Sequence, residues 1–259
     1  MKVKIASGWS NPGGSTIAHI LLCNLFNDNG IDCTFYGPHP WHLKKCKADL
    51  LQNIQVQKQD ILISHFLPFH KFKCKKHILS CHETNFYDLK TIENKWDSIH
   101  FVSNFQKNWQ GSPSNSFVIP NVLPLLKKSP LNTKCAGVVG SIDSHKQTHL
   151  SVKRALSDGF EKVYIFGHNG DPVYFLNEIK PMIGDKVIHI NNMEDQQKMY
   201  DMVDAVYHSS KRETFNYVKA ECNLTGVDYR GLDSADSNAE YWDNDRILKE
   251  WKHYFTKIN

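Results

Sequence analysis

Short apolar runs alternate with longer amphipathic segments along this chain, and the alternation is the feature that most restricts its fold. Runs rich in Ile, Val and Phe that are bounded by turn residues are typical of buried strands in a parallel sheet. One such run at residues 2–8 precedes a predicted helix over 16–30, which ends at Asn29-Gly30, and a second run follows at 31–37. The chain therefore opens as a βαβ unit.

The alternation continues in two series. Further strand-like runs of the first series cover residues 60–66, 77–82, 98–103 and 116–121, and a polar stretch follows at 125–134. In the second series, predicted strands at 136–141, 162–167, 186–191 and 204–210 alternate with predicted helices at 148–159, 173–184 and 195–203. The predicted fold class is therefore α/β, with two Rossmann-like, doubly wound domains that face each other across a cleft and bind ligands at the carboxyl ends of their strands.

The predicted domains are residues 1–125 and 126–239. A chain of 259 residues with 41% hydrophobic content is long enough for two such units. Residues 240–259 carry apolar side chains with largely helical spacing, and we expect this segment to return to the first domain as a core helix. The residues concerned are Tyr241, Trp242, Ile247, Leu248, Trp251 and Phe255.

Positive charge is concentrated in the first half of the chain. Residues 1–125 contain 13 Lys, no Arg and 8 acidic residues, and the segment 44–77 alone has eight lysines against two aspartates. One interpretation is a solvated surface that keeps the protein soluble. The other is a docking face for an anionic partner: an acidic glycan, a glycolipid at a membrane surface or a nucleic acid. The candidates for contact with such a partner in this segment are Lys44, Lys45, Lys73, Lys75 and Lys76.

Cysteine usage and hydropathy indicate the compartment. The seven cysteines are odd in number and form no CxxC pair, which favours reduced thiols over disulfides or a zinc site. No apolar run approaches the roughly 20 residues that span a bilayer, and the first residues are too weakly apolar for a signal peptide. We expect a cytoplasmic protein without a transmembrane segment, with peripheral attachment to a membrane surface as the alternative. The oligomeric state stays open.

The segment SSKRETFNYVKAEC, residues 209–222, carries two glutamates eight positions apart, Glu213 and Glu221. On one helix they would lie within roughly 80° of each other around the axis but more than two turns apart along it. Glycoside hydrolases need two carboxylates that flank one bond, and this spacing does not provide them. The two glutamates are instead placed to hold the two ends of one elongated ligand.

Several segments, in order, resemble those of the GT-B fold nucleotide-sugar glycosyltransferases, especially the retaining glycosyltransferase family 4. They are NPGGSTIAH, DILISHF, CHETN, FVSNFQKNW, VIPNVL, VVGSIDSHKQ and SSKRETFNYVKAE. They run along nearly the whole length, and the chain looks like a compact member of that family. The number, order and spacing of these segments, rather than any single one, carry the resemblance.

The resemblance implies a donor site in the second domain. Glu221 would hold the ribose hydroxyls through charge-assisted hydrogen bonds, and Glu213 would lie beside the transferred sugar. The backbone amides of Thr214, Phe215 and Asn216, at a predicted helix start, would receive the diphosphate.

The resemblance also implies which groups act on the leaving diphosphate and the sugar. Lys146 would stabilise the leaving diphosphate, and Gly140 and Ser141 precede it in the same segment. Ser141 stands where the family usually has arginine, so one cation is missing; Arg212 either replaces it or is an ordinary surface residue. In the first domain, Gly13 and Gly14 would let the backbone approach the donor. His82 would hydrogen-bond the sugar, with packing as the alternative.

The implied reaction transfers a sugar from a nucleoside-diphosphate sugar, with a UDP-sugar as the expected donor, to a hydroxyl acceptor with retention of configuration. No cofactor and no catalytic metal are expected. A glycan or glycolipid is the favoured acceptor, and a phage-type DNA glycosyltransferase acting on hydroxymethylated bases is the first alternative. The second alternative is a non-catalytic module that binds sugar nucleotides or nucleic acid. A nicotinamide-dependent dehydrogenase is disfavoured because no GxGxxG follows the first strand.

Overall fold

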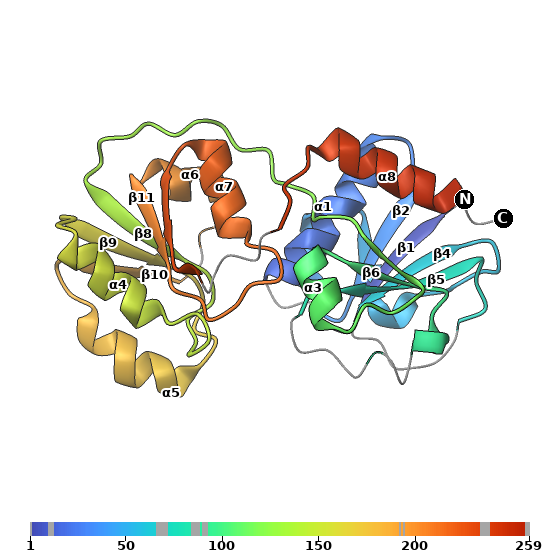
Figure 1. The fold of residues 1–259 in the computed structure, drawn as a ribbon, viewed down its shortest axis with the longest axis horizontal. Coiled ribbons are helices and arrows are strands. Elements are labelled where there is room, and N and C mark those ends of the chain that lie inside the picture. The colour runs from blue at the N-terminus through green and yellow to red at the C-terminus, as the bar shows by residue number, and fades with distance from the viewer. Residues whose placement is uncertain are drawn as a thin grey trace. The chain divides into compact units, whose positions relative to one another are not determined.

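The computed structural model describes residues 2–9, 13–65, 72–83, 89, 93–191, 193, 195–233 and 239–256. The chain divides into two compact units (Figure 1). Unit 1 comprises Met1–Leu123 and Asn238–Asn259, and unit 2 comprises Pro124–Ser237. The domain limits read from the sequence differ from these by two residues. None of the described helices is long and apolar enough to cross a membrane.

Unit 1 is built on a seven-stranded sheet in the order β3-β2-β1-β4-β5-β6-β7, in which every pairing is parallel. The strands are β1 (Val3–Ser7), β2 (Cys33–Gly37), β3 (Ala48–Leu50), β4 (Ile61–His65), β5 (Lys76–Cys81), β6 (Ser98–Phe101) and β7 (Ser116–Val118). The central strands β1, β4, β5 and β6 are buried along their whole length. Continuous burial explains why they read as unbroken apolar runs.

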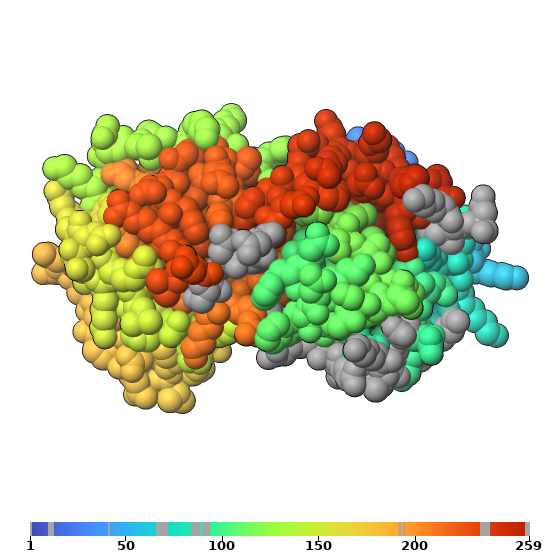
Figure 2. Space-filling view, in the orientation of Figure 1, coloured from blue at the N-terminus to red at the C-terminus, as the bar shows by residue number. Residues whose placement is uncertain are grey.

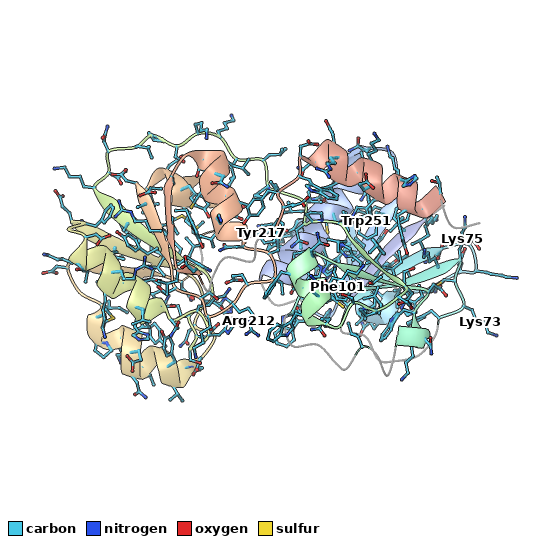
Figure 3. The ribbon with its side chains drawn as sticks, in the orientation of Figure 1. Lys73, Lys75, Phe101, Arg212, Tyr217 and Trp251 are labelled. Atoms are coloured by element: carbon cyan, nitrogen blue, oxygen red, sulfur yellow. The ribbon has the colours of Figure 1, made fainter. Side chains whose placement is uncertain are left out.

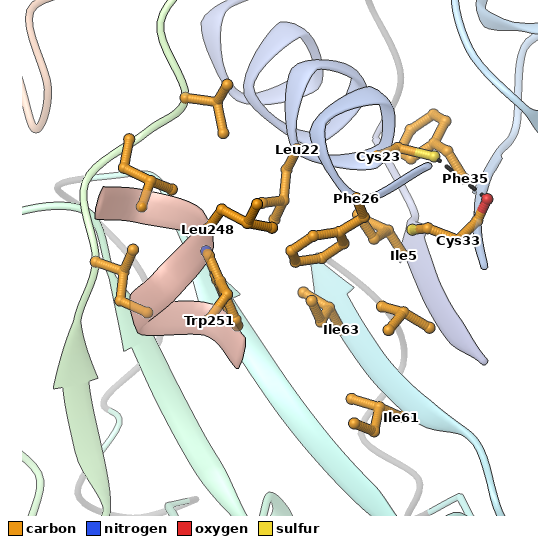
Figure 4. Packing of buried hydrophobic residues seen from close by; sticks show 14 of the residues in the cluster. Ile5, Leu22, Cys23, Phe26, Cys33, Phe35, Ile61, Ile63, Leu248 and Trp251 are labelled. Carbon is orange, nitrogen blue, oxygen red and sulfur yellow. Dashed lines mark hydrogen bonds between the residues drawn. The ribbon is translucent and has the colours of Figure 1, made fainter. Parts of the chain in front are cut away.

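Two helices cover one face of this sheet: α1 (Gly14–Asp28) and α8 (Asn244–Thr256). Ile247, Leu248, Trp251 and Phe255 form one face of α8, and all are buried. The Trp251 ring meets the Phe26 ring of α1 edge-on, with centroids 6.0 Å apart (Figure 4). The opposite side of α8, in red, lies on the surface of unit 1 in Figure 2. The predicted return of the C-terminal helix to the first domain is confirmed.

Unit 2 is a smaller doubly wound domain. Its parallel sheet has the order β10-β9-β8-β11-β12. The strands are β8 (Cys135–Val139), β9 (Lys162–Phe166), β10 (Val187–Ile190), β11 (Ala205–His208) and β12 (Asp228–Gly231). Helix α4 (Thr148–Ser157) and the segment that begins with α5 (Pro172–Tyr174) pack on one face, and α6 (Gln196–Asp201) and α7 (Tyr217–Thr225) pack on the other. The α/β fold predicted from the two series is confirmed.

The remaining short elements are α3 (Asn104–Trp109) and several single turns. These turns are Pro40–Lys44, Leu51–Asn53, Glu93–Lys95, Phe175–Ile179 and Lys180–Met182. Strands β3 and β12 were not predicted. Each is a short strand at the edge of its sheet and contains polar residues, unlike the apolar central strands. The predicted linker at 125–134 contains no helix or strand. All seven cysteines are free thiols.

Gly226 ends α7 in the left-handed conformation, with φ +81°. Alanine at this position is expected to lower the free energy of unfolding by about 1–2 kcal/mol, because a Cβ disfavours this region of φ/ψ space. Gly184 is the matched control in the same unit, since its φ is not positive and a Cβ there would meet no atom within 4 Å. Urea denaturation of both variants tests this. Equal stability of Gly226→Ala and Gly184→Ala would contradict it.

Candidate functional site

The strand order places a candidate ligand site at the carboxyl edge of each sheet. In unit 1 the order in which strands are added to the sheet reverses at β1: β2 and β3 lie on one side of β1, and β4 to β7 lie on the other. In unit 2 the same reversal falls between β8 and β11. Open α/β sheets bind ligands outside the carboxyl ends of the strands at such a reversal. The residues at these ends are Ser7 and His65 in unit 1, and Val139 and His208 in unit 2.

An ion pair between Lys146 and Glu213 lies at the reversal point of unit 2. Lys146 Nζ is 2.5 Å from Glu213 Oε1, and His208 Nε2, from the last residue of β11, is 2.9 Å from the same oxygen. Oε2 of Glu213 has no hydrogen-bond partner among the described residues. This second carboxylate oxygen is therefore left for a ligand.

Glu213 is ionised in this environment. Burial opposes its ionisation, but the charge of Lys146 and the hydrogen bond from His208 outweigh burial and lower the pKa of the Glu213 carboxyl to about 2. The side chain is 14% exposed. The site therefore holds a fixed negative charge next to a fixed positive one, the combination that suits a sugar hydroxyl on one side and a phosphate on the other.

The loops that carry these two residues are joined by His145. Lys211 N donates to the His145 carbonyl at 3.0 Å, and His145 Nε2 donates to the Arg212 carbonyl at 2.8 Å. Ser141, at the position where the resembled family has arginine, donates its hydroxyl to Asp143 Oδ2 at 2.5 Å. Asp143 Oδ1 accepts from the backbone N of Lys146 at 2.8 Å. Ser141 and Asp143 thus shape the turn before Lys146 and add no positive charge.

Glycines let the loops after β8 and β9 approach closely at the same edge. Gly140 has φ +129°, a conformation that favours glycine. A Cβ on Gly167 would lie 1.8 Å from the Gly140 carbonyl oxygen, so no other residue fits there without a shift of the backbone. Further along the two loops, Ile142 forms a β-bridge with Asn169.

The helix after Glu213 begins later than the sequence interpretation assumed. Asn216 is the N-cap of α7, and its side chain accepts from Lys219 N at 3.0 Å. Thr214, Phe215 and Asn216 therefore precede α7 rather than form its first turn. Phe215 and Asn216 are buried. The helical-spacing argument for Glu213 and Glu221 is wrong, because only Glu221 lies on the helix.

Glu221 belongs to a separate polar group between α7 and α6. It is 4% exposed, accepts from Gln196 Nε2 at 2.6 Å and accepts from the Tyr200 hydroxyl at 2.5 Å. Burial raises the pKa of Glu221 to about 7, and the two hydrogen bonds counteract only part of that effect. The structure thus brings Gly140, Ser141, Lys146, Arg212 and Glu213 together at one edge, whereas Glu221 lies within α7 and bonds to Gln196 and Tyr200 of α6.

Four histidines gather at the carboxyl edge of unit 1. His65 ends β4, His82 follows β5, His100 lies on β6, and His19 lies on α1. The centroid of the His19 ring is 4.9 Å from that of His65 and 4.5 Å from that of His82. All four side chains are at least nine-tenths buried. Only His82 of this group was predicted as a site residue.

His82 is neutral. Burial, reinforced by the neighbouring histidines His19, His65 and His100, holds its pKa well below the usual value. The neighbouring Glu83 binds His65 Nε2 through both carboxylate oxygens, at 3.0 and 3.1 Å. It reaches only the backbone N of His82, at 3.3 Å. The His82 ring is held by Ser80, whose Oγ lies 3.0 Å from Nε2.

A cavity of about 10 Å³, room for about one water molecule, lies beside these histidines. His19, Ser80, His82, His100 and Trp251 contribute to its lining. Neither ring nitrogen of His19 has a hydrogen-bond partner among the described residues.

Gly13 is the N-cap of α1 and Gly14 is its first residue. The Gly13 carbonyl accepts from Ile17 N at 3.0 Å. Residues 10–12, which precede them in the glycine-rich turn, lie outside the described residues. Gly13 and Gly14 follow β1 at the same carboxyl edge as His65 and His82.

Among the five lysines proposed to contact the acceptor, Lys73 and Lys75 do not lie with His82. Lys73 and Lys75 are exposed, and they precede β5 at the amino end of the sheet, where Lys75 N bonds to the Asp60 carbonyl just before β4 (Figure 3). Lys44 and Lys45 are exposed in the connection between β2 and β3. Lys76 was wrongly grouped with them. It is 7% exposed on β5, its Nζ lies 3.9 Å from the Tyr254 ring centroid, and burial lowers its pKa to about 8.

Residues that the sequence interpretation missed are His208 in unit 2 and His19, His65 and His100 in unit 1. A signal was present for His65: the run LISH ends its strand with a histidine, and the run LSCH likewise has a histidine directly after its strand. Among the described residues, no three His, Cys, Asp or Glu side chains are grouped so as to hold a metal ion.

No protein-family model matches the chain, and no curated protein matches it in sequence. Solved structures match its fold. The Anabaena protein HepE in complex with UDP-glucose superposes with a TM-score of 0.71 at 13% identity, over 100% of this chain and 91% of HepE. AviGT4, a glycosyltransferase involved in avilamycin A biosynthesis, gives 0.63 at 13% identity, over 100% of this chain and 98% of AviGT4.

An alpha-glucosyltransferase in complex with UDP and a 13-mer DNA gives a TM-score of 0.60 at 9% identity, over 100% of this chain and 90% of that one. Identities this low show a shared fold and nothing finer. The likeness covers both units. The chain has the two-domain α/β fold of the GT-B glycosyltransferases.

Proposed function

We propose that the protein is a retaining glycosyltransferase that moves a sugar from a UDP-sugar to a hydroxyl of a glycan or glycolipid. The observation that carries the proposal is the Lys146–Glu213 ion pair at the reversal point of the unit 2 sheet, 2.5 Å apart, in a chain with the GT-B fold. A cation for the diphosphate and a carboxylate for the sugar are what such a donor requires at one place.

In this proposal, Lys146 carries the charge that stabilises the departing diphosphate. The bond between the anomeric carbon and the phosphate oxygen breaks, and the acceptor oxygen bonds to the same face of that carbon. The acceptor proton passes to the departing phosphate oxygen, so no separate general base is needed. Glu213 Oε2 holds a sugar hydroxyl and stabilises the positive anomeric centre, and His208 keeps the carboxylate in place from Oε1.

The other predicted residues keep their assigned roles as part of the proposal. The loops at Gly140 and Ser141, with Arg212 and the backbone of Thr214, Phe215 and Asn216, receive the diphosphate, and Glu221 receives the ribose. In unit 1, His82 hydrogen-bonds the transferred sugar. Gly13 and Gly14 let the backbone of the turn after β1 approach the donor closely. Lys73 and Lys75, two of the exposed lysines, lie at the amino end of the unit 1 sheet and away from His82, which favours a glycan over a nucleic acid as acceptor.

The test is a panel of UDP-, GDP- and ADP-sugars with the purified protein. We expect UDP and one UDP-sugar to raise the stability of the fold, by about 2.7 kcal/mol at one hundred times the Kd. Slow release of UDP from that sugar nucleotide without acceptor is expected as well. With an acceptor supplied, the new glycosidic bond should keep the anomeric configuration of the donor by NMR. EDTA should leave the rate within about twofold, because Lys146 supplies the charge that a metal ion would otherwise supply.

Each part of the proposal has its own contrary outcome. Binding of UDP without any release of sugar would mean a non-catalytic binding module. No binding of any sugar nucleotide by folded protein would refute the donor assignment. An inverted product would refute the retaining mechanism, and activity abolished by EDTA and restored by Mg²⁺ would refute the proposed role of Lys146 as the main counter-charge.

A further inference from the structure

Three side chains of unit 1 form a continuous hydrogen-bonded chain that begins at His82. Ser80 Oγ lies 3.0 Å from His82 Nε2 and 3.0 Å from His100 Nδ1. His100 Nε2 lies 2.7 Å from the carbonyl oxygen of Ile119. Ser80 of β5 and His100 of β6 are directly opposite each other in the parallel register, so the sheet itself fixes their contact.

The direction of every hydrogen bond in this chain follows from its last member. The Ile119 carbonyl can only accept, so His100 carries a proton on Nε2. Burial lowers the pKa of His100 to about 4, so this ring is neutral and its Nδ1 is an acceptor. The Ser80 hydroxyl must then donate to His100 Nδ1. The Ser80 oxygen is left to accept, and the His82 nitrogen that faces it must donate.

We infer that Ser80 and His100 are positioning residues that fix His82 as the tautomer with its proton on Nε2 and a lone pair on Nδ1. Because His82 is neutral, a group that meets Nδ1 has to donate a hydrogen bond. This deepens the proposed function and rests on it for the identity of the ligand: Nδ1 accepts a hydroxyl proton of the transferred sugar. The opposite tautomer would turn an N–H toward the same hydroxyl, and His82 would then donate that hydrogen bond instead of accepting it.

The tautomer is measurable without any substrate. Long-range proton–nitrogen correlation spectra of the ¹⁵N-histidine-labelled protein show which ring nitrogen carries the proton, and a His82→Gln sample identifies the His82 signals among the 14 histidines. We expect His82 and His100 both to carry the proton on Nε2. A proton on Nδ1 of His82 in the unmodified protein would overturn the inference.

Serine variants separate this role from packing. Ser80→Ala should mix the two His82 tautomers. Ser64→Ala is the matched control: Ser64 is a buried serine on the adjacent strand β4, and its Oγ lies 2.9 Å from Nε2 of another histidine, His77. The control should leave the His82 tautomer unchanged. A His82 spectrum in Ser80→Ala identical to that in Ser64→Ala would refute the positioning role.

Two amide replacements of His100 test the direction of the hydrogen bonds from His82 to Ile119. In His100→Asn, the side-chain oxygen can occupy the place of Nδ1 and still accept from Ser80. In His100→Gln, the amide nitrogen can replace Nε2 and donate to Ile119, while the acceptor for Ser80 is lost. Both remove the ring that packs 4.8 Å from Trp251, so their structural cost is matched. We expect the single His82 tautomer in the asparagine variant and a mixture in the glutamine variant; the reverse result would contradict the inference.

Activity gives the second readout. Ser80→Ala should lower kcat/KM about fivefold to tenfold, as expected for one weakened neutral hydrogen bond, and Ser64→Ala should leave it unchanged. If the tautomer shifts but the rate does not, then His82 does not contact the sugar, and the proposed role of His82 fails while the tautomer assignment stands. If UDP-sugars do not bind at all, the spectra still decide whether Ser80 and His100 set the tautomer.

Discussion

Replacing Lys146 with alanine is expected to lower kcat/KM for the sugar nucleotide about 10²–10³-fold. The size is that of other single groups that stabilise developing negative charge in a transition state. Lys146 sits in the loop after β8, and its Nζ pairs with Glu213 Oε1 at 2.5 Å. Steady-state kinetics with the UDP-sugar identified by the panel measure the loss.

The controls separate charge at this point from charge in general. Lys146→Arg keeps the cation and should recover part of the rate. Lys153 is an exposed lysine on α4, and Lys153→Ala should match the unmodified protein. Because Lys146 helps to hold the pKa of Glu213 at about 2, its removal raises that pKa, and the acid limb of the pH–rate profile should move to higher pH. Full activity of folded Lys146→Ala would disprove the leaving-group role.

The central strands of this fold are predicted well from the sequence, because strands buried on both faces of a parallel sheet are continuously apolar. Each central strand appears as an apolar run, and α8 appears as a helical stripe of large side chains. The start of α7 was also readable and was missed. Asn216 is a favoured N-cap residue, and recognising it would have placed Glu213 before the helix instead of on it.

The side-chain groups at the sheet edges were harder to predict, because they depend on strand order. His65 meets His82 only because β4 and β5 are neighbours, and Ser80 meets His100 only through the β5–β6 register. No local pattern shows which strands are adjacent. Lys76 illustrates the opposite difficulty: a lysine within a basic segment is predicted to be exposed, whereas Lys76 lies on the fully buried strand β5 and packs against the Tyr254 ring.

Glu221 should make the stability of the protein fall as the pH rises. Its folded-state pKa is raised from 4.5 to about 7, so between these values the folded protein binds more protons than the unfolded chain. The stabilisation is fully present below pH 4.5 and is lost as the pH rises through 7, a change of about 3 kcal/mol. Glu221→Gln cannot titrate, so the difference in stability between this variant and the unmodified protein should shift by that amount in favour of the variant.

Measuring that difference is necessary because buried histidines act in the opposite direction. The pKa values of His19, His82 and His100 are lowered, so these groups add stability as the pH rises. Urea denaturation at several pH values, with and without Glu221→Gln, removes their contribution. Glu178→Gln, an exposed change in the same unit, should show no such shift. A pH-independent difference between Glu221→Gln and the unmodified protein would show that Glu221 titrates normally.

The ionisation of Glu221 also gives a test of its proposed contact with the nucleotide. Ribose hydroxyls donate to a carboxylate, so the affinity for UDP-glucose should increase as the pH rises from 6 to 8 and Glu221 ionises. In the free protein, Gln196 and Tyr200 already donate to the Glu221 carboxylate, one to each of its two oxygens. Titration calorimetry with UDP-glucose and its 2′-deoxy analogue gives a double-mutant cycle with Glu221→Gln. If Glu221 binds the ribose, removing the hydroxyl weakens binding to the unmodified protein and hardly affects the variant. Equal losses in both proteins would leave Glu221 as a buried acid that joins α7 to α6, and the ribose would have to be held by another residue.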